Sequence, residues 1–304
     1  MAAVQTPSTR KVLFFGTLSV YSHAVLLNLL KRGVKVVSVI VSGATPYQRP
    51  DELNNIPIAE HPKFTTIETL AAEHHLPIHY VMDISDPQFA STLEEYQADF
   101  ILLACFPYKI PENIRQIPKK QCVNIHPSLL PAYRGPHPVF WQLKFGEKRM
   151  GVSLHRVTEE WDAGDIILQA EVQINAGMRS RAIDNKLGEY GAIVFAEVLR
   201  LYEVNNVILK TQDNTLSSHQ SSPQHEDFML SPQWSARQAF SFMRGTDEWE
   251  RNYQINIGGS TIIVKSAMAY SPSASISTPY ELEDNYITMQ FSPGLLTAYI
   301  ESIT

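Results

Sequence analysis

Short apolar runs of strand length recur along the first 126 residues of the chain. Single polar residues such as Ser38 and His79 interrupt them, which is typical of strands covered on both faces in parallel sheets. Helical patterns separate several of these runs, and Ser22–Lys31 stops just before Gly33. The predicted strands are Val12–Phe15, Val36–Val41, Ile78–Val81, Phe100–Cys105 and Cys122–Ile125, and the other predicted helices are Thr66–His75 and Pro87–Tyr96. This alternation predicts an α/β fold with an open, right-handed, mostly parallel Rossmann-like sheet.

The pattern changes after Pro127. Ser128–Pro138 is a turn-rich loop, and Leu216–Asp227 is a polar stretch with four serines and almost no apolar residue. Between and after these segments we expect two strands forming a hairpin over 159–165, two helices and three β segments. They are Gly151–Val157, Ile166–Ile174, Ser180–Val204, Trp234–Met243, Tyr253–Ile257, Ser260–Ala267 and Tyr286–Phe291.

The chain therefore divides into four predicted parts. Residues 1–10 form a polar tail, 11–210 an α/β domain that carries the chemistry, and 211–227 a linker. Residues 228–304 form a small β-rich domain, and a shortened OB-like barrel is one architecture that this domain could adopt.

Composition narrows the class of protein. The 304 residues are 44% hydrophobic and 18% charged, with a net charge of −6 that offers no general attraction to nucleic acid. Both cysteines, Cys105 and Cys122, lie in apolar runs, and we expect them to be reduced core residues. We find neither an apolar run long enough to span a membrane nor a signal peptide, so we expect a soluble, cytoplasmic protein.

Candidate chemistry is concentrated just after the strand that ends near residue 125. Asn124 and His126 are two residues apart and would share one face of that strand. An amide can hydrogen-bond an oxygen that gains negative charge, and an imidazole can move a proton near neutral pH. Asp162, in the predicted hairpin turn, could orient the imidazole. Considered alone, residues of these types in such positions more often cap and shape turns than catalyse reactions, and Asp165 is better explained as a turn residue.

The segment Asn124–Pro136 resembles the signature of the 10-formyltetrahydrofolate-dependent formyltransferases. The shared features are the N-x-H pair, the S-L-L-P and R-G that follow it, and D-x-G-D beginning at Asp162. The likeness covers about residues 10–204, and the extra C-terminal region resembles the plan of methionyl-tRNA formyltransferase. The resemblance implies direct attack of an amine on the formyl carbon, with Asn124, His126 and Asp162 as catalytic residues. No covalent enzyme intermediate is then needed.

The resemblance also implies where 10-formyltetrahydrofolate, the co-substrate, would bind. The pterin would be held by backbone in two segments, the apolar wall would come from leucines, and the signature loop would complete the site. The implied residues are Leu103, Cys105, Phe106, Pro107, Tyr108, Ser128, Leu129, Leu130, Arg134, Gly135, Thr158, Glu160 and Trp161. We expect no metal site, because His74, His75 and His79 lack a metal-ligand pattern. Trp141 is expected to anchor the helix after the loop, and His61 and His137 to be surface or loop residues.

The acceptor remains open at this stage. In methionyl-tRNA formyltransferases the loop after the second strand is typically basic, whereas its counterpart here, about Gly43–Thr65, has Arg49 and Lys63 against three acidic residues. Residues 226–304 carry four Lys or Arg against nine Asp or Glu, a formal charge of −5. These departures favour a small amine acceptor, such as an amino sugar nucleotide or an amino acid derivative, over Met-tRNA. Hydrolysis of the formylated folate and non-catalytic folate binding are further alternatives, no membrane partner is expected, and a homodimer is left open.

Overall fold

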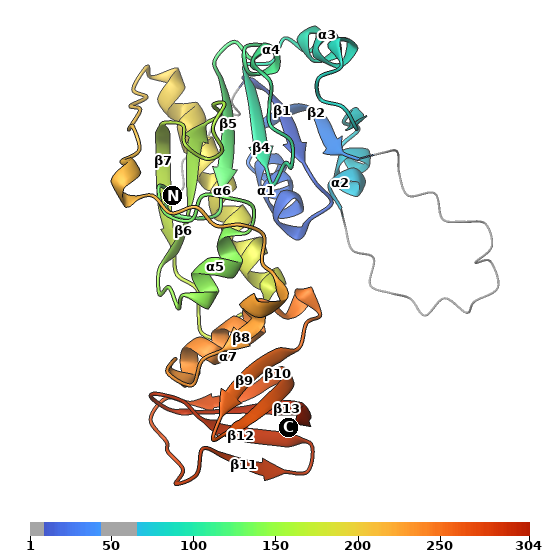
Figure 1. The fold of residues 1–304 in the computed structure, drawn as a ribbon. Coiled ribbons are helices and arrows are strands. Elements are labelled where there is room, and N and C mark those ends of the chain that lie inside the picture. The colour runs from blue at the N-terminus through green and yellow to red at the C-terminus, as the bar shows by residue number, and fades with distance from the viewer. Residues whose placement is uncertain (1–8, 44–65) are drawn as a thin grey trace, which may run out of the picture. The chain divides into compact units, whose positions relative to one another are not determined.

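The computed structural model describes residues 9–43 and 66–304. These residues form two compact units that interleave along the chain (Figure 1). Of the described residues, the first unit comprises 9–43, 66–126, 152–170 and 187–214. The second comprises Pro127–Gly151, Glu171–Lys186 and Thr215–Thr304. Because the units alternate in sequence, the predicted division into domains at 210 and 228 remains a proposal.

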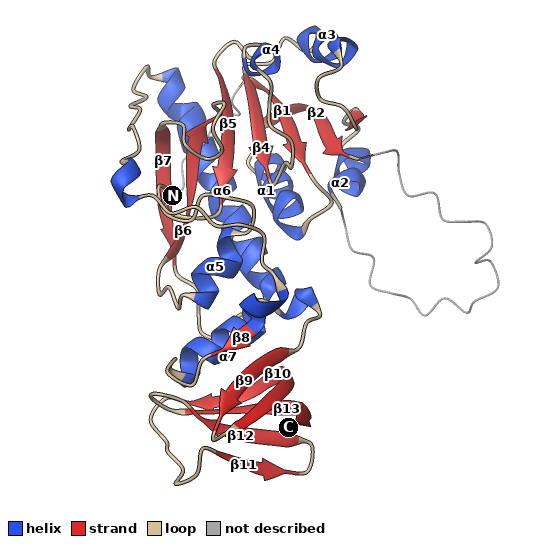
Figure 2. Ribbon diagram, viewed as in Figure 1, coloured by secondary structure: helices blue, strands red, loops and turns tan. Residues whose placement is uncertain are grey.

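A seven-stranded sheet in the order β3-β2-β1-β4-β5-β6-β7 organises the α/β part of the chain (Figure 2). Its strands are β1 (Lys11–Gly16), β2 (Lys35–Ser42), β3 (Ile78–Val81), β4 (Phe100–Ala104), β5 (Gln121–His126), β6 (Met150–Arg156) and β7 (Ile166–Val172). The pairings among β1 to β5 are all parallel, and β6 runs antiparallel to β5. The predicted mostly parallel sheet is confirmed.

Helices cover both faces of this sheet. Side chains alternate along a strand, so Leu13 and Phe15 join a core cluster with Leu93 and Ile114 on one face. Leu93 belongs to α3 (Pro87–Glu95) and Ile114 to α4 (Glu112–Arg115), which cover that face.

The opposite face is covered by α1 (Val20–Lys31) and α6 (Ser180–Glu203), and α2 (Ile67–Glu73) packs beside α1. Phe195 of α6 meets Phe100 at 5.7 Å between ring centroids. Gly188 lets α6 approach α1 closely, since a Cβ there would lie 2.6 Å from the Cβ of Ala24.

The second unit contains α5, α7 and a six-stranded sheet in the order β11-β12-β13-β10-β9-β8. Its elements are α5 (Pro138–Lys144), α7 (Ala236–Gly245), β8 (Met229–Leu230), β9 (Tyr253–Ile257), β10 (Ser260–Ser271), β11 (Tyr280–Glu283), β12 (Tyr286–Gln290) and β13 (Leu295–Ile303). The mainly-β character predicted for the C-terminal region is confirmed. Three strands of this sheet, β8, β11 and β13, were not predicted. β8 has two residues and β11 four, mostly exposed, whereas β13 is a nine-residue strand that the sequence analysis missed.

The two cysteines differ in burial. Cys122 is buried as expected, but Cys105 is exposed. Cys105 adopts φ +60°, which ends β4 one residue earlier than predicted and turns this residue out of the core. His61 and the loop residues Arg49 and Lys63 lie outside the described part of the chain. No helix in 9–43 or 66–304 is long and apolar enough to cross a membrane.

Candidate active site

Strand β5 presents the predicted amide and imidazole on one face. Asn124 and His126 point to the same side as Cys122, while Ile125 points to the opposite side, where its side chain faces Gly191 of α6. His126 is 4% exposed, and Asn124 is half-buried. The pair therefore sits at the carboxyl end of a parallel strand, where open α/β sheets hold their ligands.

Asp162 joins this pair from the loop between β6 and β7. Its Oδ1 lies 3.5 Å from Nδ1 of His126 and accepts a 3.4 Å hydrogen bond from Nδ2 of Asn124. The residue is 9% exposed and adopts φ +53°, a left-handed conformation that Asp tolerates better than most side chains. The structure thus brings together the three residues predicted to be catalytic, although their roles remain a proposal.

His155 is a fourth member of this cluster that sequence reasoning missed. It lies on β6 directly opposite Asn124 in the antiparallel register. Its Nε2 is 3.1 Å from Nδ2 of Asn124 and 3.5 Å from Oδ1 of Asp162. Its Nδ1 lies 2.8 Å from the carbonyl oxygen of Arg156, which can only accept, so Nδ1 carries a proton. In the neutral ring Nε2 then accepts from the Asn124 amide. The only feature of the sequence that pointed to His155 was a single histidine within the predicted strand Gly151–Val157.

Gln212 holds the loop that carries Asp162. Its Nε2 donates to the carbonyl oxygens of Asp162 and Gly164, both at 2.7 Å, and the residue is only 7% exposed. The backbones of Lys210 and Ile166 exchange two hydrogen bonds of 2.9 and 2.8 Å beside it. No sequence pattern indicated this contact, because Gln212 lies 50 residues from Asp162 in a polar stretch.

The cluster combines one carboxylate, two imidazoles and an amide with little exposure to solvent. Burial strengthens electrostatic interactions among these groups. The arrangement can therefore move a proton through His126 while an amide N–H stabilises a developing oxyanion.

The folate contacts implied for the first unit lie on two segments. Leu103 and Phe106 are buried in the hydrophobic core, Tyr108 packs partly against it, and Cys105 and Pro107 are exposed. Thr158, Glu160 and Trp161 are exposed in the β6–β7 loop, where the Thr158 hydroxyl donates to the Glu160 carbonyl at 3.0 Å. The side chains of Leu103 and Phe106 thus pack in the core, independently of any ligand that their backbone groups bind.

The signature loop belongs to the second unit and packs tightly there. Ser128 and Leu130 are buried, Leu129 is half-buried, and the Ser128 hydroxyl donates to the Ala132 carbonyl at 2.8 Å. The backbone of Arg134, a residue 9% exposed, pairs with 218–220 of the predicted linker through two 2.9 Å bonds.

Gly135 and Trp141 complete that packing. Gly135 has φ +114°, and a Cβ there would lie 2.2 Å from the Gln220 carbonyl. Trp141 is buried in α5 and donates to the Ser221 carbonyl at 2.9 Å, which fits the predicted anchoring role.

Among the residues that the structure describes, no group of three His, Cys, Asp or Glu side chains could hold a metal ion.

Comparisons with known proteins show which family the chain belongs to. The chain is 30% identical over 239 residues to a methionyl-tRNA formyltransferase from Protochlamydia amoebophila, which is 79% of this chain and 72% of that protein. An N-formyltransferase from Helicobacter canadensis, solved with folinic acid and dTDP-3-aminofucose, matches with a TM-score of 0.66 and 17% identity. That match covers 97% of this chain and 100% of that one.

A second structure, the sugar 3N-formyltransferase WlaRD with dTDP and 5-N-formyl-THF, matches with a TM-score of 0.65 and 18% identity over 96% of this chain and 97% of that one. At such identities the structural matches establish the shared fold. The family model described as formyl transferase matches residues 10–199, which include Asn124, His126 and Asp162. The chain belongs to the formyl transferase family.

Proposed function

We propose that this formyltransferase transfers the formyl group of 10-formyltetrahydrofolate to the primary amine of a small molecule, an amino sugar nucleotide or an amino acid derivative. The observation that carries the proposal is the convergence of Asn124, His126 and Asp162 within 3.5 Å contacts in the first unit. The solved Helicobacter canadensis and WlaRD structures support the choice of donor, since each was crystallised with a folate.

Asn124 stabilises the oxyanion in this mechanism. The acceptor nitrogen forms a bond to the formyl carbon, and the carbonyl electron pair moves onto the oxygen. Of the two hydrogen bonds that the Asn124 amide donates, the 3.4 Å bond to Asp162 is longer than the 3.1 Å bond to His155. The amide can exchange the longer bond for one to the oxyanion while His155 continues to hold it. A donor of this kind contributes about 10²- to 10³-fold to the rate.

His126 and Asp162 move the proton. Collapse of the tetrahedral species breaks the bond between the formyl carbon and the folate nitrogen. The acceptor nitrogen loses one proton and the departing folate nitrogen gains one, so the reaction balances without another reactant. His126 relays this proton, and Asp162, 3.5 Å from its Nδ1, stabilises the charged imidazole while the proton is in transit.

Folate contacts are proposed for exposed parts of two segments that belong to the same unit as the catalytic cluster. Cys105, Pro107 and Tyr108 follow β4, and Thr158, Glu160 and Trp161 precede Asp162. Backbone donors and acceptors of these segments suit a pterin, and the exposed Trp161 ring offers an apolar surface. The signature-loop residues Ser128, Leu129, Leu130, Arg134 and Gly135 are retained as proposed contacts from the family resemblance.

Charge supports a small acceptor. Residues 226–304 carry a formal charge of −5, which opposes the phosphate contacts that dominate affinity for nucleic acid. Both matched sugar formyltransferase structures are covered over at least 97% of their length by this chain. Methionyl-tRNA remains the second candidate acceptor, because the matched Protochlamydia relative has that name.

A direct assay distinguishes these possibilities. The full chain is incubated with 10-formyltetrahydrofolate and, separately, dTDP-amino sugars, free amino acids or Met-tRNA, and release of tetrahydrofolate is measured alongside mass spectrometry of the acceptor. We expect formylation of an amino sugar nucleotide or an amino acid derivative. Formylation of Met-tRNA alone would contradict the small-molecule acceptor, and release without any acceptor would identify a hydrolase.

A further inference from the structure

A serine lies directly opposite His126 in the paired strands β5 and β6. The antiparallel register that sets His155 against Asn124 also sets Ser153 against His126. Ser153 and His155 are two residues apart on β6, so their side chains lie on the same face of the sheet. Because the Cβ atoms of directly opposed residues lie about 4.5 to 5.5 Å apart, the Ser153 hydroxyl is within reach of the His126 imidazole.

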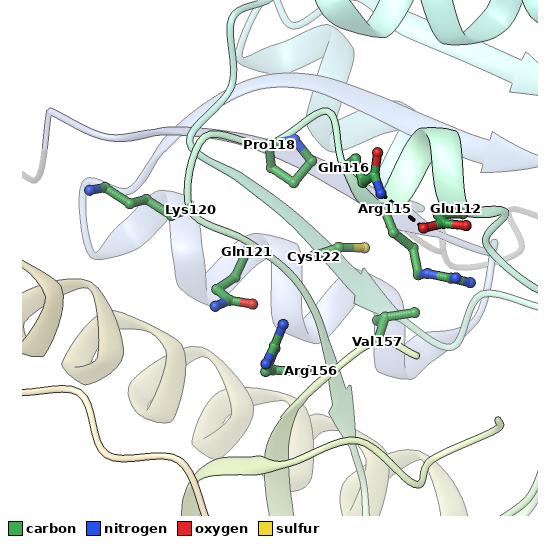
Figure 3. Close-up of a pocket in the computed structure, with 9 residues that line it drawn as sticks. All are labelled: Glu112, Arg115, Gln116, Pro118, Lys120, Gln121, Cys122, Arg156 and Val157. Atoms are coloured by element: carbon green, nitrogen blue, oxygen red, sulfur yellow. Dashed lines mark hydrogen bonds between the residues drawn. The ribbon is translucent and has the colours of Figure 1, made fainter. Parts of the chain in front are cut away.

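The other end of these two strands follows the same alternation. Figure 3 shows this end, where Cys122 and Val157 lie beside each other. The backbone N–H of Val157 donates to the Cys122 carbonyl at 2.9 Å. Cys122 belongs to the core cluster on one face of the sheet, and Val157 packs against that cluster. The side chains at positions 153, 155 and 157 therefore share one face, which is also the face of Asn124 and His126.

Gln169 of β7 holds the Ser153 side chain. Its Nε2 donates to the Ser153 hydroxyl at 2.7 Å, and Ser153 is fully buried. Since β6 lies between β5 and β7 in the sheet, His126, Ser153 and Gln169 form a polar row across three neighbouring strands. The bond from Gln169 uses one acceptor site of the hydroxyl, which can also donate its proton.

Asp162 by itself holds the His126 ring only loosely. Its Oδ1 faces His126 at 3.5 Å, His155 at 3.5 Å and the Asn124 amide at 3.4 Å. Contacts of this length are weaker than hydrogen bonds of ordinary length, and three groups share one oxygen atom. A further polar contact beside the imidazole would restrict its orientation.

We propose that Ser153 and Gln169 are positioning residues for His126, and this proposal rests on the proton relay assigned to His126 in the proposed function. A hydroxyl can donate to a neutral imidazole and accept from a charged one. Ser153 therefore suits a neighbour that gains and loses a proton in each turnover. The bond from Gln169 holds the hydroxyl in place, so the imidazole keeps the same neighbour before and after the proton moves.

Steady-state kinetics of the full chain, with 10-formyltetrahydrofolate and the amine that it formylates, provide the first test. We expect Ser153→Ala to lower kcat about tenfold without changing KM for folate, because the ring orientation is altered and binding is not. Gln169→Met, which keeps the side-chain length but cannot donate, should lower kcat less. The double variant should be no slower than Ser153→Ala, since Gln169 acts through Ser153.

Ser38→Ala is the matched control. It also removes a fully buried strand hydroxyl of the first unit, one that donates to the Pro77 carbonyl at 3.0 Å. Circular dichroism checks the fold of each variant. Gln169→Met, at a half-buried position, carries the test if Ser153→Ala is unstable.

A second measurement does not depend on turnover. NMR of the histidine rings in the full chain, without folate or amine, follows His126, whose signal is identified by its loss in His126→Ala. We expect Gln169→Met to shift this signal although a whole strand separates the two residues, and to have no such effect once Ser153 is replaced by alanine. If the kinetic assay shows no turnover but this coupling is found, the proposed function fails and the polar row stands.

Four outcomes would overturn the proposal. Three are kinetic: unchanged kcat in Ser153→Ala, an equal loss of kcat in Ser38→Ala, and a double variant in which the two losses multiply. The fourth is a His126 ring signal that Gln169→Met leaves unshifted.

Discussion

The carboxylate of Asp162 has two imidazoles and one amide within 3.5 Å of a single oxygen atom. Two of these contacts come from β5 and one from β6, so each depends on how the two strands pair. His155 orients the Asn124 amide, and Gln212 holds the backbone on which Asp162 sits. At the scale of residues, the proposed mechanism therefore extends beyond the three residues of the sequence signature.

Loss of the proton relay proposed for His126 and Asp162 should mainly lower the turnover number. We expect His126→Ala or Asp162→Asn to lower kcat by about 10²- to 10⁴-fold, the range typical of general acid–base catalysis. Steady-state kinetics with 10-formyltetrahydrofolate measures this loss. Tyr80→Phe serves as a control, since that hydroxyl bonds Glu68 away from the cluster. Unchanged turnover in either variant would remove that residue from the mechanism.

Gln212 tests whether loop position controls catalysis. Gln212→Met keeps the volume but leaves the carbonyls of Asp162 and Gly164 without this donor. We expect about a tenfold lower kcat with little change in KM for folate, and a shifted pH–rate profile, because the carboxylate that orients His126 moves. The exposed Gln88→Met variant is the control. An unaltered pH profile would show that Gln212 has only a structural role.

At the scale of elements, the β6–β7 connection is the most constrained part of the site. Gly164 passes so close to β6 that a Cβ there would lie 2.0 Å from the Arg156 carbonyl. Gln212 and the paired backbones of Lys210 and Ile166 secure the same connection from the segment that follows α6. Distant parts of the chain thus set the geometry of one turn.

Substitution of Gly164 by Ala should therefore disturb both stability and activity. The added methyl group meets a backbone atom that cannot move without distorting β6, and we expect a loss of about 1–3 kcal/mol in unfolding free energy. Urea denaturation measures this loss. The neighbouring Ala163→Ser variant, at a partly exposed position, is the control. A Gly164→Ala protein as stable as Ala163→Ser would show that the loop can shift freely.

At the scale of the whole molecule, buried charge makes stability depend on pH. Burial, together with repulsion from Glu248, raises the pKa of Asp184 to about 7. The folded state thus disfavours the ionised form of a carboxyl group whose pKa in the unfolded chain is about 3.9. The neutral group is present in both states below pH 4, and stability is lost as the pH rises toward 7.

Asp184→Asn should remove this dependence. We expect the variant to be more stable than wild type by about 1–2 kcal/mol at pH 8, a discounted value because Asp184 keeps some solvent contact, and equal to it near pH 4. Thermal unfolding across that pH range provides the measurement. Glu73→Gln, at an exposed position, should show no such divergence. A constant difference between Asp184→Asn and wild type at every pH would contradict this assignment.

Much of the fold could be predicted from the sequence, because apolar periodicity reports local burial. The strands of the first unit were predicted to within two residues at either end, and α6 differed by one residue. The strands β8, β11 and β13 were missed. β8 and β11 are short, and the C-terminal half of β13 is exposed, so these strands depend on pairing with their neighbours more than on a periodic apolar pattern.

The sequence by itself determined the family and the identity of the proposed catalytic trio, because Asn124, His126 and Asp162 keep a characteristic order and spacing. Only the tertiary structure decided what surrounds them. His155 reaches Asn124 through antiparallel register, and Gln212 reaches Asp162 across 50 residues. Contacts of this kind depend on long-range packing, which leaves no periodic trace along the chain.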